Sequence, residues 1–186
     1  MLRIRVLAFP REATKFRGAM LLRAVFGSLL GICGLLGCSS QPPPPSHPSP
    51  LLGNPMPAFE SQTISGNPVI SGAYQGHTVV VSFVSAKCPS CEKTLSAANS
   101  LYEDNHQLVV VGVFQKEHAE GAVPVASRLA LRFPIIVDRD GSISRQFKVG
   151  ETVPSTFVVD PDGRVRWVGG SDLTVDGLDR AVQAAR

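Results

Sequence analysis

Long apolar runs alternate with helical patterns in the part of the chain that follows residue 56. The segments HTVVVSFV (77–84) and QLVVVGVF (107–114) are almost continuously apolar, which is typical of strands buried on both faces of a sheet. Between them, Leu95, Ala98 and Tyr102 recur at spacings of three and four residues, so that one face of a helix would be apolar. The pattern predicts a buried strand, an amphipathic helix and a second buried strand.

Weaker patterns on both sides of this unit predict the remaining elements. Two short extended pieces meet at Ser65-Gly66-Asn67 and predict a hairpin before the first buried strand. After the second strand we expect a helix, a short strand, a hairpin that turns at Asp162-Gly163, and a closing helix capped by Thr174. The segments concerned are AVPVASRLALRF (122–133), PIIVD (134–138), STFVVDPDGRVRWVG (155–169) and LTVDGLDRAVQAAR (173–186).

The alternation of strands and helices predicts an α/β fold. We expect a mostly parallel central sheet with an N-terminal β-hairpin and a C-terminal antiparallel hairpin, and helices on both faces of the sheet. The chain has 186 residues, of which 44% are hydrophobic, and this is enough to bury one core. The sequence therefore predicts a single domain at residues 57–186.

The first 37 residues have the order of charged and apolar residues that is found in export signals. They hold six Lys or Arg residues and one acid, Glu12, and an apolar stretch at 24–36 follows. This stretch is too short to cross a bilayer, which takes roughly 20 residues, but it suits a signal peptide. We expect the chain to leave the cytoplasm, and Met20 is an alternative start site.

The sequence LLGC at 35–38 resembles the lipobox of bacterial lipoproteins, in which a peptidase cuts before the cysteine and the cysteine carries the lipid. Gly37 and Cys38 fit this motif, whereas Leu36 is larger than the residue usually found there. The resemblance implies a signal peptide at 1–37, lipidation of Cys38, and an anchor in the outer membrane or in the outer leaflet of the inner membrane, facing the periplasm. A plain signal peptide with an incidental cysteine is the alternative.

A proline-rich segment follows Cys38, with six prolines between Pro42 and Pro50. Such a run favours extended polyproline II at about 3.1 Å per residue, so that residues 39–56 would reach roughly 55 Å. We expect residues 38–56 to be the lipidated cysteine and a tether, with a proline-rich ligand for a partner domain as the alternative. Without the signal peptide the chain has twelve basic and fourteen acidic residues, and no charge pattern for nucleic-acid binding remains.

The chain has only four cysteines. Cys33 lies in the predicted signal peptide and Cys38 at the predicted lipidation site, which leaves Cys88 and Cys91 as the free thiols of a protein in an oxidising compartment. These two lie at the predicted junction of a strand and a helix. They can pair with each other or with a partner protein.

From about Pro57 to its end, the chain resembles the thioredoxin superfamily, and in particular the TlpA/ResA-like exported thiol-disulfide oxidoreductases of the AhpC/TSA-redoxin branch. Three segments carry the resemblance: the entry hairpin PAFESQTISGNPVISGAYQGHTVVVSF (57–83), CPSC (88–91) after the first buried strand, and VPSTFVVDPDGRV (153–165). The resemblance implies a thioredoxin-like fold and thiol-disulfide exchange without a further cofactor.

In this family the first cysteine attacks and the second resolves, which implies these roles for Cys88 and Cys91. A cysteine in the first turn of a helix faces free N–H groups and the positive end of the helix dipole, and in such motifs the thiol pKa falls from about 8.5 to roughly 3.5–7.5. Pro89 suits the first helical position because no N–H is needed there. The resemblance also implies a cis bond at Val153-Pro154 that exposes the backbone of Val153 to a substrate strand; a trans proline that opens an edge strand is the alternative.

Several positions depart from the family pattern. Lys87 stands where relatives often have Trp, and its ammonium either supports a thiolate at the first cysteine or points to solvent. Ser82 takes the place of the buried acid of thioredoxins. Thr94 and Ser96 replace a Glu and a Pro of TlpA-like relatives, so that proton transfer at the second cysteine lacks an obvious carboxylate apart from Glu92.

We therefore expect a membrane-anchored periplasmic thiol-disulfide oxidoreductase that reduces exported proteins and receives electrons from a membrane carrier. CPSC lacks the histidine of strong oxidants, in which a very stable thiolate makes the disulfide oxidising, and this favours reduction. The predicted partners are periplasmic protein thiols and disulfides, and the membrane through the lipid anchor.

Four other interpretations remain open. A copper-binding metallochaperone of thioredoxin fold would want a wider cysteine spacing and a late histidine, and none follows His118. A zinc site needs four ligands, but His77, His106 and His118 are scattered through predicted loops or strand starts, so we predict no metal site. A peroxiredoxin-like peroxidase would have proline where Val81 stands, although Ser85 fits its pattern. An inert disulfide is the last alternative, but a bond that closes so short a loop contributes little to stability.

Overall fold

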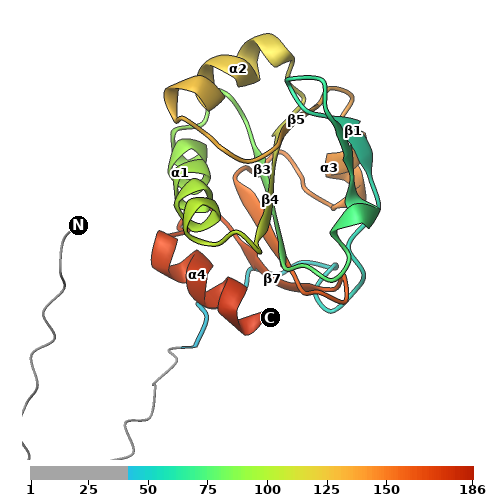
Figure 1. The fold of residues 1–186 in the computed structure, drawn as a ribbon, viewed down its shortest axis with the longest axis vertical. Helices are drawn as coiled ribbons and strands as arrows, with labels where there is room; N and C mark the ends of the chain where they lie inside the picture. Colours follow the sequence, from blue (N-terminus) through green and yellow to red (C-terminus); the bar gives the residue numbers. More distant parts are fainter. Residues whose placement is uncertain (1–41) are drawn as a thin grey trace, which may run out of the picture. The chain divides into compact units, whose positions relative to one another are not determined.

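The computed structural model describes residues 42–186 (Figure 1). The predicted signal peptide and the predicted lipidation site at Cys38 lie outside this part of the chain, so these two predictions stay untested. In chain order the elements are β1 (Glu60–Gln62), β2 (Pro68–Ile70), the 3₁₀-helix η1 (Ser71–Tyr74), β3 (Val79–Val84), α1 (Pro89–Asp104), β4 (Val109–Gln115), α2 (Ala119–Arg128), β5 (Ile135–Asp138), α3 (Ser142–Gln146), β6 (Ser155–Val159), β7 (Val165–Gly169) and α4 (Val175–Ala184).

Five strands form the central sheet in the order β5-β4-β3-β6-β7. The pairs β3-β4 and β4-β5 are parallel, whereas β3-β6 and β6-β7 are antiparallel. The α/β fold is confirmed, and so are the hairpins β1-β2 and β6-β7. The sheet is mixed, because β6 runs antiparallel to the other four strands and pairs with both β3 and β7.

Each central strand contributes to two cores, because successive side chains of a strand point to opposite faces of the sheet. From β3, Val80 and Val84 face the core under α1, α2 and α4, whereas Val81 and Phe83 face the core under the β1-β2 hairpin and α3. All residues of β3 are buried, as the continuous apolar run predicts. The predicted helices on both faces of the sheet are thereby confirmed (Figure 1).

The helix after the cysteines and the closing helix follow their predicted patterns. In α1, Leu95 and Ala98 are fully buried, and Tyr102 packs at the border of the same core. At the start of α4, the backbone N–H of Gly177 donates to Thr174 Oγ1 at 3.0 Å, which is the predicted cap. Among residues 42–186, the helices are too short or too polar to span a lipid bilayer.

The bounds of α2 differ from the helix predicted at 122–133. The helix begins three residues earlier and ends at Arg128. It ends there because Ala130 adopts a left-handed conformation (φ 49°), which closes the last turn. Phe133 is still buried although it lies beyond the helix. The apolar period thus continues past the helix end because the following loop also packs into the core.

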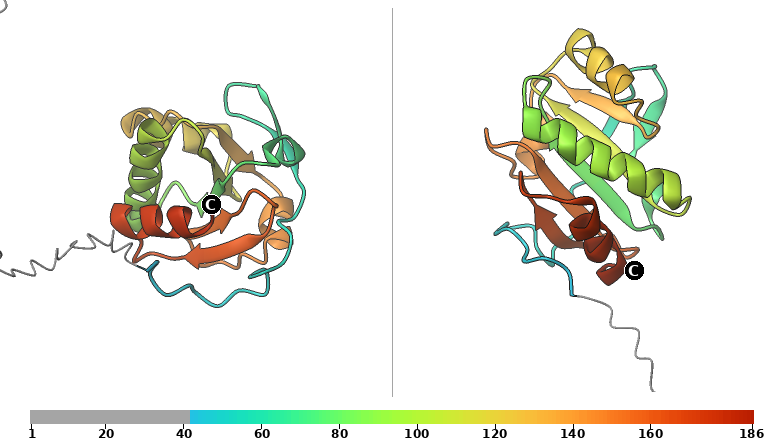
Figure 2. Two further views of the ribbon diagram at one scale, coloured as in Figure 1. Left: turned by 60° about the horizontal axis from the view of Figure 1, so that its bottom comes forward. Right: turned by 90° about the vertical axis from the view of Figure 1, so that its left-hand side faces the viewer.

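Residues 44–56, which we name the edge segment, lie along the outer side of β7 (Figure 2). The backbone N–H of His47 donates to the carbonyl of Val168 at 2.8 Å. The N–H of Gly53 donates to the carbonyl of Val165, also at 2.8 Å. The edge segment therefore occupies the hydrogen-bonding groups on the open side of the last strand.

The edge segment moves the boundary of the folded domain, which the sequence predicts at Pro57. At its start, the carbonyl of Pro44 accepts a hydrogen bond from the indole N–H of Trp167 at 2.8 Å. Prolines have no backbone N–H, so a proline-rich sequence is typical of a free tether. Here the residues between the prolines supply the donors, and from Pro44 on the chain packs against the domain.

The opposite outer strand, β5, is covered as well. Thr63 forms an isolated antiparallel bridge with Ile136, and the N–H of Ile64 donates to the carbonyl of Ile135 at 2.8 Å. The chain that connects β1 to β2 therefore lies along β5.

Candidate active site

Cys88 lies where β3 leads into α1. Three residues follow the end of the strand at Val84, and Cys88 then forms the N-cap of the helix with extended backbone angles (φ −120°, ψ 105°). Pro89 is the first helical residue, as predicted. The sulfur of Cys88 therefore lies at the helix end where backbone N–H groups are free to bind an anion.

Cys88 and Cys91 form a disulfide, with their Cα atoms 5.2 Å apart. Cys88 is partly exposed, whereas Cys91 is only 1% exposed. This difference suits the predicted roles, because an attacking sulfur has to reach a substrate and a resolving sulfur has to reach only its neighbour.

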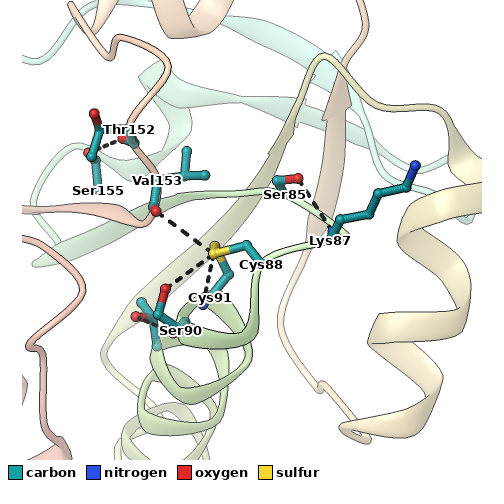
Figure 3. The surroundings of a disulfide bond; sticks show 9 residues. Ser85, Lys87, Cys88, Ser90, Cys91, Thr152, Val153 and Ser155 are labelled. Carbon is teal, nitrogen blue, oxygen red and sulfur yellow. Dashed lines mark hydrogen bonds between the residues drawn. A yellow bond between two sulfur atoms is a disulfide. The ribbon is translucent and has the colours of Figure 1, made fainter.

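Three polar atoms surround Cys88 Sγ (Figure 3). The N–H of Cys91 donates to it at 3.1 Å, and the hydroxyl of Ser90 donates at 3.3 Å. The carbonyl oxygen of Val153 lies 3.8 Å away. Hydrogen bonds to the charged form of a group stabilise that form, so in the reduced protein the two donors would favour a thiolate at Cys88.

The peptide bond between Val153 and Pro154 is cis, as the resemblance implies. It lies directly before β6; Pro154 is buried and Val153 is partly exposed. The carbonyl of Val153 points toward the sulfur of Cys88 (Figure 3), although 65 positions separate the two residues in the chain. The fold therefore brings the two predicted parts of the site together.

The charged residues next to the cysteines point elsewhere. Lys87 is exposed, and its side chain extends away from the sulfurs (Figure 3). Of the two orientations that the sequence leaves open for Lys87, the structure has the one directed to solvent. Glu92 forms an ion pair with Arg128 of α2, so its carboxylate is engaged at the surface between the two helices.

Hydroxyl groups occupy three of the positions that depart from the family pattern, and those of Ser82 and Thr94 form hydrogen bonds inside the fold. Ser82 Oγ and Thr156 Oγ1 lie 3.1 Å apart, and both residues are fully buried. Thr94 Oγ1 donates to the carbonyl of Ser90 at 3.3 Å. Ser82 lies between Val80 and Val84 on β3 and shares their face of the sheet. A paired, uncharged hydroxyl group thus stands where thioredoxins are expected to have an acid.

The residues of the alternative sites lie as follows. Ser85, which fits the peroxidase pattern, accepts a hydrogen bond from the N–H of Lys87 at 3.4 Å. Within residues 42–186, no three His, Cys, Asp or Glu side chains lie close enough together to hold a metal ion.

Three residues near the site are not singled out by the sequence. Ser90 lies between the cysteines, and this position is a signal that could have identified it. Gln115 Nε2 donates to the carbonyl of Gly150 at 3.0 Å, and Lys116 Nζ forms an ion pair with Glu151. Nothing in the sequence predicts these two contacts, because each joins a side chain at the end of β4 to a loop that is distant in the chain.

The order of the strands in the sheet and the cysteine pair at the start of α1 are typical of thioredoxin-like proteins. The structure is similar to that of a thiol:disulfide interchange protein of the thioredoxin family from Chlorobium tepidum, with a TM-score of 0.65 and 21% identity, over 76% of this chain and 99% of that chain. Within this class, residues 52–168 match the AhpC/TSA family. The chain belongs to the AhpC/TSA family.

Curated relatives indicate the kind of chemistry. The chain is 25% identical over 137 residues to the thiol-disulfide oxidoreductase ResA of Geobacillus kaustophilus. The alignment covers 73% of this chain and 78% of the relative. The chain is 31% identical over 139 residues to a peroxiredoxin of Thermoplasma volcanium, in an alignment that covers 63% of this chain and 64% of the relative. The predicted family, fold and enzyme class of thiol-disulfide oxidoreductase are confirmed.

Proposed function

We propose that the protein reduces disulfide bonds of exported proteins through the pair Cys88 and Cys91. One observation carries the proposal, namely the environment of Cys88 Sγ. Cys88 is partly exposed, and its sulfur accepts two hydrogen bonds and is bonded to the sulfur of the buried Cys91. The arrangement separates an accessible attacking group from a protected resolving group.

The exchange proceeds in two displacements. The thiolate of Cys88 attacks one sulfur of the substrate disulfide, and the other substrate sulfur leaves as a thiolate and takes up a proton. Cys91 then loses its proton and attacks Cys88 Sγ, which releases the second substrate thiolate and forms the disulfide present in the structure. Counted from the Cys88 thiolate and the Cys91 thiol, the cysteine pair gives up two electrons and one proton, and the released substrate thiolates take up that proton and one more from solvent.

Val153 and Pro154 provide the proposed binding site for the substrate. The backbone of Val153 lies outside β6, and its carbonyl is 3.8 Å from the attacking sulfur. An extended substrate segment that forms hydrogen bonds with this backbone, as in strand addition, places its own cysteine beside Cys88. Protein disulfides in extended segments are therefore the substrate class that the geometry favours.

The proposed setting is the periplasmic side of the cell envelope. The basic and then apolar order of residues 1–36 supports export. After each turnover the disulfide has to be reduced again, and a membrane dithiol carrier is the proposed electron donor. The sequence CPSC, which has no histidine between its cysteines, supports the reducing direction.

The reduction potential of the Cys88–Cys91 pair tests the proposal. Equilibration of the protein with dithiothreitol or glutathione buffers is expected to show a reversible two-electron transition at a potential more negative than about −200 mV, on the reducing side of protein disulfide isomerase. The protein should also accelerate insulin reduction by dithiothreitol. A pair without a reversible transition would be an inert disulfide, and a potential near −120 mV, as in strong oxidants, would reverse the direction.

The same preparation tests the peroxidase alternative, which the peroxiredoxin match supports. We expect the reduced protein to react faster with insulin disulfides than with hydrogen peroxide at equal concentration. The opposite order would favour a peroxidase.

A lipid on Cys38 is the proposed membrane anchor, supported by the sequence LLGC at 35–38. Expressed with its own N-terminus in a Gram-negative host, the protein is expected to incorporate labelled palmitate and to fractionate with membranes. The variant Cys38→Ala should lose both properties, whereas the control variant Cys33→Ala should keep them. A wild-type protein without label in the soluble periplasmic fraction would contradict the proposal.

A further inference from the structure

The carbonyl that faces Cys88 belongs to a segment without regular structure. Residues 149–154 form neither helix nor strand. Lys148 adopts a left-handed conformation (φ 56°) and turns the chain out of α3. Backbone pairing of β6 with β3 begins only after this segment, at Ser155, and side chains from elsewhere in the fold contact the residues before Val153.

Two such contacts come from the carboxyl end of β4. Gln115 Nε2 donates to the carbonyl of Gly150 at 3.0 Å, and Lys116 Nζ forms an ion pair with Glu151. The backbone of Lys116 is itself fixed, because its N–H donates to the carbonyl of Asp138 at 2.8 Å. The loop before Val153 is therefore held by a strand that is paired on both sides.

The register of the sheet links these contacts to the attacking sulfur. β3 and β4 are parallel, and Val84 at the end of β3 pairs with Phe114 of β4. The chain then continues from β3 to Cys88 and from β4 to Gln115 and Lys116. Cys88 thus follows one strand, and the two residues that contact the loop before Val153 lie at the end of its neighbour, with the alignment of the two strands set by backbone hydrogen bonds.

We infer that Gln115 and Lys116 are positioning residues for protein substrates. They hold residues 150–153 so that the backbone of Val153 meets an incoming substrate segment beside Cys88. The inference rests on the proposed function, because it assumes that substrates pair with Val153.

The two residues should contribute unequally. The side chains of Lys116 and Glu151 are 54% and 85% exposed, and exposed ion pairs are weak and screened by salt. The hydrogen bond from Gln115 to the carbonyl of Gly150 does not depend on charge. Gln115 should therefore contribute more than Lys116 to the positioning of the loop, and its contribution should not depend on salt.

Substitution by methionine tests the inference, because methionine keeps the side-chain stem and removes the polar end. The KM for insulin is expected to rise about fivefold in Gln115→Met, about twofold in Lys116→Met and about tenfold in the double variant. The kcat should change less than twofold. The rate of reduction of 5,5′-dithiobis(2-nitrobenzoate), a small disulfide that needs no strand pairing, and the Tm should stay unchanged.

Three controls separate positioning from charge and from stability. Lys93→Met removes the same charge from an exposed position of α1 and should leave the KM for insulin unchanged. Lys116→Arg keeps the ion pair and should restore the wild-type KM. Raising the ionic strength should abolish the effect of Lys116→Met but not that of Gln115→Met.

Two results would overturn the inference and can be told apart from failure of the proposed function. An unchanged KM in the double variant would show that these contacts do not position the substrate. If the double variant lost as much rate with the small disulfide as with insulin, Gln115 and Lys116 would affect the reactivity of Cys88 and not the binding of the protein substrate. If the wild-type protein does not reduce insulin at all, the proposed function fails, and the inference fails with it.

Discussion

Replacement of Cys88 by serine is expected to abolish disulfide exchange. The rate of insulin reduction should fall to that of dithiothreitol alone, because Cys88 is the partly exposed cysteine at the helix start and Cys91 is only 1% exposed. The remaining thiol of Cys91 has no access to a bulky protein disulfide. The measurement is the insulin turbidity assay with purified wild-type and variant protein.

Replacement of Cys91 by serine should have a different outcome. Cys88 keeps its exposure and the hydroxyl donor of Ser90, so attack continues, but no second thiol releases the captured substrate. Mixed disulfides should accumulate and should be visible on non-reducing gels. Equal rates of alkylation of the two single variants by iodoacetamide would contradict this assignment of roles.

Phe147→Ala is expected to have the largest effect on stability, a loss of about 3–5 kcal/mol in the free energy of unfolding. Phe147 is fully buried, and its ring lies 4.9 Å from that of Phe83, 5.2 Å from that of Phe157 and 6.0 Å from that of Phe59, measured between centroids. Removal of the ring leaves a cavity where the chain after α3 meets β3, β6 and the residue before β1. Urea unfolding under non-reducing conditions measures the loss.

Two companion variants make this result specific. Phe147→Leu fills most of the space and should cost less than Phe147→Ala. Ile70→Ala removes an apolar side chain that is 49% exposed and should change stability by less than about 0.5 kcal/mol. A loss below about 1 kcal/mol for Phe147→Ala would mean that this core rearranges to fill the cavity.

Elements could be predicted from the sequence where neighbouring residues show a clear pattern of apolar positions or caps. The continuous apolar runs gave the two central strands, β3 and β4, because strands covered on both faces need no polar positions. Thr174 could be identified as a cap because its hydroxyl acts within one helical turn. Helix α3 was missed, because its five residues are too few to show an apolar period.

Pairings between distant segments could not be predicted in the same way. The position of β6 beside β3 makes the sheet mixed, and no local pattern encodes which strand becomes the neighbour. The sequence predicts that the edge segment belongs to a tether because a run of prolines favours extended polyproline II, yet His47 and Gly53 donate to β7. Such contacts depend on which surface the chain meets after folding.

The residues of the candidate site also differ in whether a local sequence pattern predicts them. Cys88 and Cys91 could be recognised from their spacing and from their place before a helix. The proximity of Val153 followed from the resemblance to a family and not from any physical pattern in the chain. The contacts of Gln115 and Lys116 with the loop before Val153 have no sequence signal, because they arise only when the end of β4 meets the loop that follows α3.

The covering of both outer strands has a consequence for behaviour at high local concentration. An uncovered outer strand offers its free N–H and C=O groups to other molecules and promotes aggregation. Here the edge segment occupies β7, and Thr63 and Ile64 occupy β5. The outer strands of crowded copies of the domain are therefore not free to pair with one another.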